Sequence, residues 1–343
     1  FIEIFRTIEA IYFDEDISTK NTYTYRIKAF SENNISDASN TKKIEWMEGL
    51  YIILWIGEHS GIVRSVNFSP DNSKVVSGGY DYKVKVWDAE TGNLLWMREH
   101  LDYVNSVNFS PDNSKVVSGG GDDKVKVWDA ATGDLLWKGE HSGIVQSVNF
   151  SPDNSKVVSG SGDDKVKVWD AATGNLFWAG EHSGIVQSVN FSPDNSKVVS
   201  GGLDGKVKVW DTATGNLFWA GEHSGVVQSV NFSPDNSKVV SGGGDDKVKV
   251  WDVVTGDLLW TGEHSGVVQS VNFSPDNSKV VSGGGDDKVK VWDVATGDLL
   301  WTGEHSDNVY SVNFSPDNSK VASGGGSTLK VWSSEYWQVT DVE

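Results

Sequence analysis

The chain has 343 residues, with 16 Trp, 13 Phe, 37 Gly, no cysteine and a formal net charge of −19. The lack of cysteine excludes disulfides, thiolate metal sites and cysteine nucleophiles. The acidic excess argues against a nucleic-acid partner, because phosphate-binding surfaces are rich in Lys and Arg. No apolar run reaches the ~18 residues of a spanning helix, so we expect no membrane insertion.

Residues 1–47 lack the regularity of the rest of the chain. The stretch NTYTYRIKAFSENNISDASN (21–40) contains an alternating segment with Tyr23, Tyr25, Ile27 and Ala29, which predicts a strand. It resembles the late strands of a fibronectin type III domain, with Tyr23 at the place of that family's tyrosine corner. The resemblance covers about half of such a sandwich of ~100 residues. We therefore expect a partial β-sandwich over 1–47, belonging to a longer protein.

A repeat of 41 residues occupies the chain from residue 50 to 343. All seven prolines lie in FSPDNS turns, and all seven histidines share one position of the repeat. Six units end in a Trp-Asp pair, and the seventh ends one residue early in Trp332-Ser333; the paired tryptophans are Trp87, Trp128, Trp169, Trp210, Trp251 and Trp292. A repeat at a constant period indicates an array of similar structural units.

Each unit contains four predicted strands, as the fifth unit illustrates. VVQSVNF (226–232) alternates apolar and polar residues, and SPDNS (233–237) is a turn. KVVSG (238–242), KVKVWD (247–252) and DLLWTGE (257–263) are three further strands, separated by turns rich in Gly and Asp. Four short strands per unit, repeated seven times, predict an all-β, seven-bladed β-propeller of four-stranded antiparallel blades over 50–343.

The units resemble the WD-repeat (WD40) β-propeller family in several linked motifs. These are GEH in the place of the family's Gly-His, the SPDNS turn, the SGGGDD turn and the terminal Trp-Asp. The departures are local: Arg98–His100 reads REH, and the seventh unit reads SGGGSTLKVWS.

Closure of the ring has two candidate segments. Leu50–Gly57 includes Trp55, which lies 41 residues before Trp96 and is in phase with the repeat. We expect this segment to complete the last blade, whose other strands come from 309–332, and so to remove free sheet edges. The C-terminal tail around Trp337 is the alternative.

The resemblance implies a hydrogen-bonded tetrad of His, Ser, Asp and Trp inside each blade. A Ser–His–Asp triad would use the same residue types, but a triad is one asymmetric site and these positions recur six times. We therefore predict a structural role, with an incomplete seventh copy, because the deletion removes its Asp. The six sets are His59, Ser77, Asp81 and Trp87; His100, Ser118, Asp122 and Trp128; His141, Ser159, Asp163 and Trp169; His182, Ser200, Asp204 and Trp210; His223, Ser241, Asp245 and Trp251; His264, Ser282, Asp286 and Trp292.

No motif predicts a cofactor or a metal site. The paired aspartates of GGGDDK lack the spacing of a calcium loop, and SGGG lacks the Lys-Ser/Thr of a phosphate-binding loop. We expect no catalytic residue and no cofactor.

Binding residues are expected where the units differ, on one rim of the channel. Terminal drift would produce the same pattern and is the alternative. Tyr and Arg are typical of interface hot spots. The candidate partner-binding residues are Arg64, Tyr80, Tyr82, Leu101, Tyr103, Asn105, Asn308 and Tyr310, from units one, two and seven.

The leading function is a non-enzymatic scaffold that presents one rim to a protein or peptide partner. A cell-surface structural or adhesive module and an enzyme with a site in the propeller channel are the alternatives, since propellers host many activities. We expect a monomeric propeller. The fibronectin-like neighbour favours an extracellular or cell-surface location over the cytoplasm.

Overall fold

The computed structural model describes residues 30–31, 34–35, 55–326 and 328–333. The chain divides into two units, Phe1–Ile52 and Ile53–Glu343. In the first unit, β1 (Phe30–Ser31) pairs antiparallel with β2 (Asn34–Ile35). The remainder of the sandwich predicted over 1–47, including Tyr23, lies outside the described residues, as does the C-terminal tail around Trp337.

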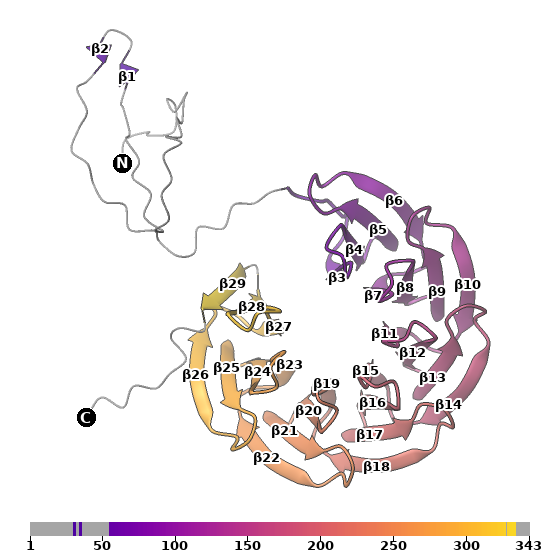
Figure 1. Ribbon diagram of the computed structural model, residues 1–343, viewed down its shortest axis with the longest axis vertical. Helices are drawn as coiled ribbons and strands as arrows, with labels where there is room; N and C mark the ends of the chain where they lie inside the picture. The colour runs from indigo at the N-terminus through magenta and orange to yellow at the C-terminus, as the bar shows by residue number, and fades with distance from the viewer. Residues whose placement is uncertain (1–29, 32–33, 36–54, 327, 334–343) are drawn as a thin grey trace. The chain divides into compact units, whose positions relative to one another are not determined.

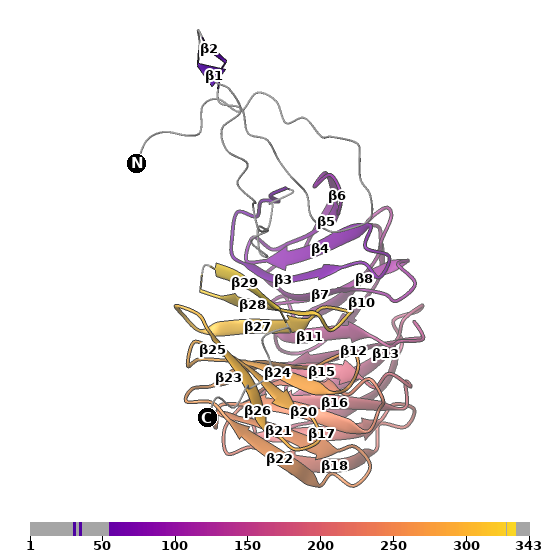
Figure 2. The same cartoon turned by 60° about the vertical axis from the view of Figure 1, so that its left-hand side comes forward.

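The second unit is a ring of antiparallel sheets that we call blades 1 to 7 (Figures 1 and 2). Blade 1 holds β3 (Val63–Phe68), β4 (Lys74–Gly79), β5 (Lys83–Asp88) and β6 (Leu94–Glu99), and blade 2 holds β7 (Val104–Phe109), β8 (Lys115–Gly120), β9 (Lys124–Asp129) and β10 (Leu135–Glu140). Blade 3 holds β11 (Val145–Phe150), β12 (Lys156–Ser161), β13 (Lys165–Asp170) and β14 (Leu176–Glu181), and blade 4 holds β15 (Val186–Phe191), β16 (Lys197–Gly202), β17 (Lys206–Asp211) and β18 (Leu217–Glu222). Blade 5 holds β19 (Val227–Phe232), β20 (Lys238–Gly243), β21 (Lys247–Asp252) and β22 (Leu258–Glu263), and blade 6 holds β23 (Val268–Phe273), β24 (Lys279–Gly284), β25 (Lys288–Asp293) and β26 (Leu299–Glu304). Blade 7 holds β27 (Val309–Phe314), β28 (Lys320–Gly325) and β29 (Thr328–Ser333).

The prediction of an all-β, seven-bladed propeller is confirmed. Strands pair in sequence order within each blade, from an inner strand to an outer one. No helix occurs among the described residues. Blade 7 has three strands in this part of the chain, so the fourth strand that we expected from Leu50–Gly57 is not among the described strands.

The turn between the first two strands of each blade is held by its own side chains. In blade 3, Ser151 Oγ donates to Asp153 Oδ1 at 2.6 Å and accepts from the Lys156 N–H at 2.9 Å. The Ser155 N–H also donates to Asp153 Oδ1 at 3.0 Å. Asn154 has a φ of 61°, a left-handed conformation that Asn tolerates better than most residues. The SPDNS sequence thus specifies its turn locally.

The hydrophobic core lies between blades. One cluster joins Val117, Val125 and Trp137 of blade 2 to Val148 and Phe150 of blade 3. Gly119 of β8 sits at this junction, and a Cβ there would lie 2.5 Å from Val145 Cγ1. Small residues therefore let successive sheets approach closely.

Polar side chains connect the inner strands around the channel. Asparagine amides donate to one another from each blade to the next at 2.8–3.0 Å, in the order Asn108, Asn149, Asn190, Asn231, Asn272, Asn313. Serines form a second row, in which Ser106 Oγ accepts from the Val148 N–H at 3.2 Å. Six junctions between neighbouring blades carry the serine contact.

The seam between blade 7 and blade 1 lacks these contacts. Val63, Val66 and Phe68 of β3 are 47%, 59% and 63% exposed, whereas Val104, Val107 and Phe109 of β7 are at most 4% exposed. On the other side of the seam, no atom of the described residues lies within 4 Å of a Cβ built on Gly324. Among the described residues, blades 7 and 1 therefore form no junction of the kind that joins the other blades (Figure 1).

Trp55 nevertheless occupies the position that the repeat predicts for it. Its Nε1–H donates to the Ala89 carbonyl at 2.9 Å, as Trp96 Nε1–H donates to the Ala130 carbonyl at 3.0 Å. Its ring stacks on Trp87 with centroids 6.1 Å apart. The phase of Trp55 is thus confirmed, and the pairing of its segment with β29 remains a prediction.

Replacing a junction glycine tests the difference between the seam and the other junctions. Gly242→Ala places a Cβ 2.6 Å from Val268 Cγ1, so we expect a loss of about 1–3 kcal/mol in the free energy of unfolding. Gly324→Ala is the matched control and should lie within about 0.5 kcal/mol of wild type. Urea unfolding at low protein concentration measures both, and an equal loss in the two variants would contradict this difference.

Candidate functional site

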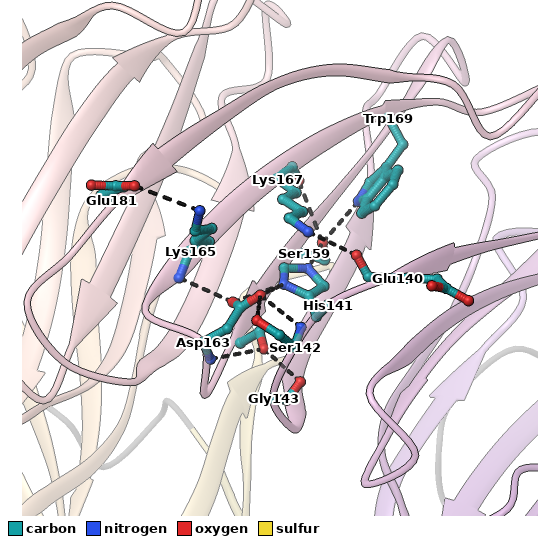
Figure 3. Close-up of polar contacts among 11 residues, drawn as sticks. Glu140, His141, Ser142, Gly143, Ser159, Asp163, Lys165, Lys167, Trp169 and Glu181 are labelled. Carbon is teal, nitrogen blue, oxygen red and sulfur yellow. Dashed lines mark hydrogen bonds and ion pairs between the residues drawn. The ribbon is translucent and has the colours of Figure 1, made fainter.

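The four predicted tetrad residues meet inside each of the first six blades, as blade 3 shows (Figure 3). His141 Nδ1 lies 2.9 Å from Asp163 Oδ1, and His141 Nε2 lies 2.8 Å from Ser159 Oγ. Trp169 Nε1–H donates to the same Ser159 Oγ at 2.8 Å. Since indole can only donate and carboxylate can only accept, the serine donates to Nε2 and Nδ1–H donates to the aspartate.

Backbone and lysine contacts complete the arrangement. The Ser142 N–H donates to Asp163 Oδ2 at 3.0 Å, which holds the carboxylate in the turn before β13. Lys167 Nζ donates to the Glu140 carbonyl at 2.7 Å and lies 5.5 Å from the Trp169 ring centroid. The lysine stem therefore covers the tetrad from the solvent side.

The six copies have nearly equal geometry. The distances from His Nδ1 to the nearer Asp oxygen are 2.7–2.9 Å, and those from His Nε2 to Ser Oγ are 2.7–2.8 Å. The Ser159, Ser200 and Ser241 side chains belong to residues with no solvent exposure. A fully buried hydroxyl, already bonded to His and Trp, is not placed to attack a substrate.

Blade 7 keeps part of the network. His305 Nε2 lies 2.8 Å from Ser323 Oγ, and Trp332 Nε1–H donates to that oxygen at 2.7 Å. Where the other blades have Asp, the Thr328 hydroxyl lies 3.2 Å from His305 Nδ1. A longer, uncharged contact thus replaces the carboxylate that the deletion removes.

Burial sets the charge state of the tetrads. It lowers the pKa of the five histidines His100, His141, His182, His223 and His264, and the facing aspartate opposes this shift. Burial would raise the pKa of Asp163, but hydrogen bonds from His141 and Ser142 outweigh it and lower that pKa. These five tetrads therefore hold neutral imidazole against carboxylate at neutral pH.

Three of the candidate binding residues form one cluster on blades 1 and 2. The Arg64 guanidinium carbon lies 5.6 Å from the Tyr80 ring centroid, and the Tyr80 and Tyr103 rings lie 5.3 Å apart at 50°. Tyr80 is 43% exposed and Tyr103 is half-buried. Burial raises the pKa of Tyr103, and the neighbouring Asp102 charge adds to the rise. We call these three residues the tyrosine–arginine cluster.

The other candidates surround this cluster or lie apart from it. Leu101 is 88% exposed and Tyr82 is 45% exposed, with a φ of 68°. Asn105 Nδ2 donates to the Val145 carbonyl and to Gln146 Oε1, so it links blade 2 to blade 3. Asn308 Nδ2 donates to Tyr310 Oη at 3.3 Å within blade 7.

Ring closure would make blade 7 the neighbour of blade 1, and this expectation stays a prediction. Asn308 and Tyr310 lie across the seam and make no described contact with the tyrosine–arginine cluster. Sequence analysis missed the exposed face of β3, whose SVNF segment is the same in every unit. The row of asparagines could have been predicted, because an Asn stands at the same position of the repeat in all seven units.

The described residues contain no group of three or more His, Asp or Glu side chains arranged to hold a metal ion. They also contain no helix with the length and apolar character needed to cross a bilayer.

Seven antiparallel sheets arranged around a channel, six of which are braced by a His–Ser–Asp–Trp tetrad, form a β-propeller. The model of the WD domain, G-beta repeat, family matches residues 52–88, 218–252, 256–293 and 297–333, and the model of the outer membrane protein assembly factor BamB family matches residues 80–222. The described part of the chain is a seven-bladed β-propeller, and it contains WD40 repeats at the residues that this family's model matches.

A curated relative is the nuclear distribution protein PAC1-1 of Uncinocarpus reesii. It is 34% identical over 64 residues, which cover 19% of this chain and 14% of the relative. The chain therefore matches only a small part of that protein's length.

The tetrads predict a loss of stability in acid. An unfolded His titrates near pH 6.5, whereas burial lowers the pKa of the folded ones, so unfolding takes up protons below that pH. The free energy of unfolding should fall by up to about 1.4 kcal/mol per pH unit for each of the five histidines named above, and the aspartates add a further loss below about pH 4. Urea unfolding between pH 7.5 and 4 measures this slope.

The control for this measurement is His223→Gln, which removes one titrating group and should reduce the slope between pH 6.5 and 5 while leaving its sign unchanged. Equal stability of the wild type at pH 7 and pH 5 would contradict neutral, buried histidines.

Proposed function

We propose that the protein is a non-enzymatic scaffold that binds a protein or peptide through the tyrosine–arginine cluster. WD-repeat propellers generally serve as protein-interaction scaffolds, which supports the class of function. The observation that carries the site is the contact of Tyr80 with Arg64 and with Tyr103. In blades 3 to 6 the corresponding positions hold mostly Gly for Tyr80, Gln for Arg64, and Ile or Val for Tyr103.

The cluster has the chemistry of a binding anchor. Tyr80 exposes an aromatic face that Tyr103 and Arg64 hold in one orientation, so little side-chain entropy is lost when a partner binds. The exposed Leu101 adds apolar area beside it, and Asp102 accepts from the Tyr103 N–H at 2.8 Å. Aromatic and Arg side chains surrounded by polar groups are typical of interface centres.

The blades with ordinary repeats offer a built-in comparison. The position of Arg64 is Gln146, Gln187, Gln228 and Gln269 in blades 3 to 6, and the position of Tyr80 is Gly in most of them. These blades carry the same scaffold without the aromatic anchors. Binding through the cluster should therefore depend on blades 1 and 2 and be indifferent to the same rim positions elsewhere.

Substitution of the two tyrosines tests the proposal. Partners are first captured from a lysate of the source organism and identified by mass spectrometry, and the purified partner is then titrated calorimetrically. Tyr80→Ala with Tyr103→Ala should weaken binding by about 30-fold or more, the effect of losing a hot spot of at least 2 kcal/mol.

Gln228→Ala is the matched control at an equivalent rim position and should leave the affinity unchanged. Circular dichroism and the unfolding midpoint establish that each variant stays folded. Equal losses in both variants, or none in either, would contradict a site at the cluster.

A further inference from the structure

Asp102 of blade 2 stands at a position where most blades have no room for a side chain. The corresponding residue is Gly in blades 1 and 3 to 6, where an added Cβ would lie 2.7–3.1 Å from the backbone of the neighbouring turn; these residues are Gly61, Gly143, Gly184, Gly225 and Gly266. Contacts this short require the turn to move. Asp102 is therefore a departure from the repeat that blade 2 accommodates only by a local adjustment.

The Asp102 carboxylate lies beside the Tyr103 ring of the tyrosine–arginine cluster. Its Oδ1 accepts from the Tyr103 N–H at 2.8 Å. A Cβ built on Gly121 would lie 3.0 Å from Asp102 Oδ2 and 3.1 Å from Tyr103 Cζ, so the carboxylate and the hydroxyl end of the ring converge on one point. Burial raises the pKa of Tyr103, and the charges of Asp102 and Asp123 raise it further. Both carboxylates thus act on the same end of the ring.

These two half-buried carboxylates have no cationic partner in the part of the chain that the structure describes. The nearest lysines of blade 2 are engaged elsewhere: Lys124 Nζ lies 2.9 Å from Glu140 Oε1, and Lys126 Nζ lies 3.1 Å from Asp122 Oδ2 in the tetrad. A carboxylate attracts a cation by its charge, and the face of a tyrosine ring attracts one by its quadrupole. The Tyr103 end of the cluster therefore offers both kinds of attraction to a cation from outside.

Arg64 shows that the tyrosine pair accepts a cation. Its guanidinium carbon lies 5.6 Å from the Tyr80 ring centroid, and it forms no ion pair with a carboxylate of the described residues. Arg98, by contrast, donates to the carbonyls of Met97 and Thr132. Arg64 thus occupies the Tyr80 side of the pair, and the Tyr103 side is left without a cation.

The charge of the whole chain acts in the same direction as these local groups. Two carboxylates face one guanidinium at the cluster, and the formal net charge of the chain is −19. The field of an acidic protein raises the local concentration of cations and speeds the approach of a cationic partner. An acidic partner would gain only the Arg64 contact and would meet the two carboxylates and this field.

We propose that the partner of the tyrosine–arginine cluster docks through a basic peptide segment. A Lys or Arg side chain of that segment lies against the Tyr103 ring and pairs with Asp102 and Asp123. Leu101, which is 88% exposed and adjoins Asp102 in the chain, contacts an apolar side chain of the same segment. This inference rests on the proposed function and adds the chemical class of the partner.

A random dodecapeptide library displayed on phage tests this chemistry, because it contains basic, acidic and neutral peptides. The library is selected on the immobilised full chain and counter-selected on the variant Tyr80→Ala with Tyr103→Ala. We expect the retained peptides to carry Lys or Arg beside an apolar residue. The most enriched peptide is then synthesised with a fluorophore and titrated by anisotropy.

Neutralising the two carboxylates is the decisive titration. Asp102→Asn with Asp123→Asn should weaken binding of that peptide by about fivefold or more, and the difference from wild type should shrink at about 1 M salt, which screens charge. Asn at position 102 keeps an acceptor for the Tyr103 N–H, so the ring should stay in place. The unfolding midpoint establishes that the variant is folded.

Asp164→Asn with Asp246→Asn is the matched control. It makes the same change in net charge at the positions that correspond to Asp123 in blades 3 and 5, and should leave the affinity nearly unchanged. Equal losses in the two Asn pairs would overturn the inference, because the attraction would then come from the general field of the chain.

The peptides themselves separate this inference from the proposed function. Retained peptides that depend on the two tyrosines but are acidic or uncharged would overturn the basic segment and leave the binding site standing. A library that yields no peptide dependent on the tyrosines would overturn the inference as well, and the capture of partners from a lysate then decides the proposed function separately.

Discussion

A single blade cannot bury its own apolar surface, and the rest of the structure depends on this constraint. Each described sheet of the propeller is three or four strands wide and one layer thick, so its valines leave water only when a neighbouring blade covers them. The core is accordingly a series of clusters, each shared by two blades. Stability then resides in the junctions, and the first and last blades are the places where burial is incomplete.

The tetrads fix the path of the turns, which the junctions between blades do not determine. Junctions of Val and Gly attract the sheets to one another but do not specify the path of the turns. The tetrad ties the segment before each blade to the blade's second and third strands, through buried hydrogen bonds that are costly to leave unpaired. A Ser, His and Asp in this setting brace the turn, although the same three residue types form catalytic sites in other folds.

Most of the fold was predictable from the sequence because the same pattern of strands and turns occurs seven times. Alternation located the strands, and the constant position of His and Trp located the tetrads. The exposure of β3 at the seam was not predictable, because unit one has the same SVNF as every other unit. Unit one differs from the others only in that no described blade covers this face. The tyrosine–arginine cluster lies between these cases: variation among units singled out its members, but only coordinates showed that Arg64 and Tyr80 meet.

The seam and the variable rim residues occupy the same end blades, and the geometry of the repeat relates them. Asn105 Nδ2 lies 3.3 Å from Gln146 Oε1, which shows that this rim position in one blade touches the same position in the next. Tyr310 and Arg64 hold that position on the two sides of the seam. The residues that depart from the repeat therefore hold equivalent rim positions in the first and last blades of the series, where the constraint of two packed neighbours differs from that on blades 3 to 6.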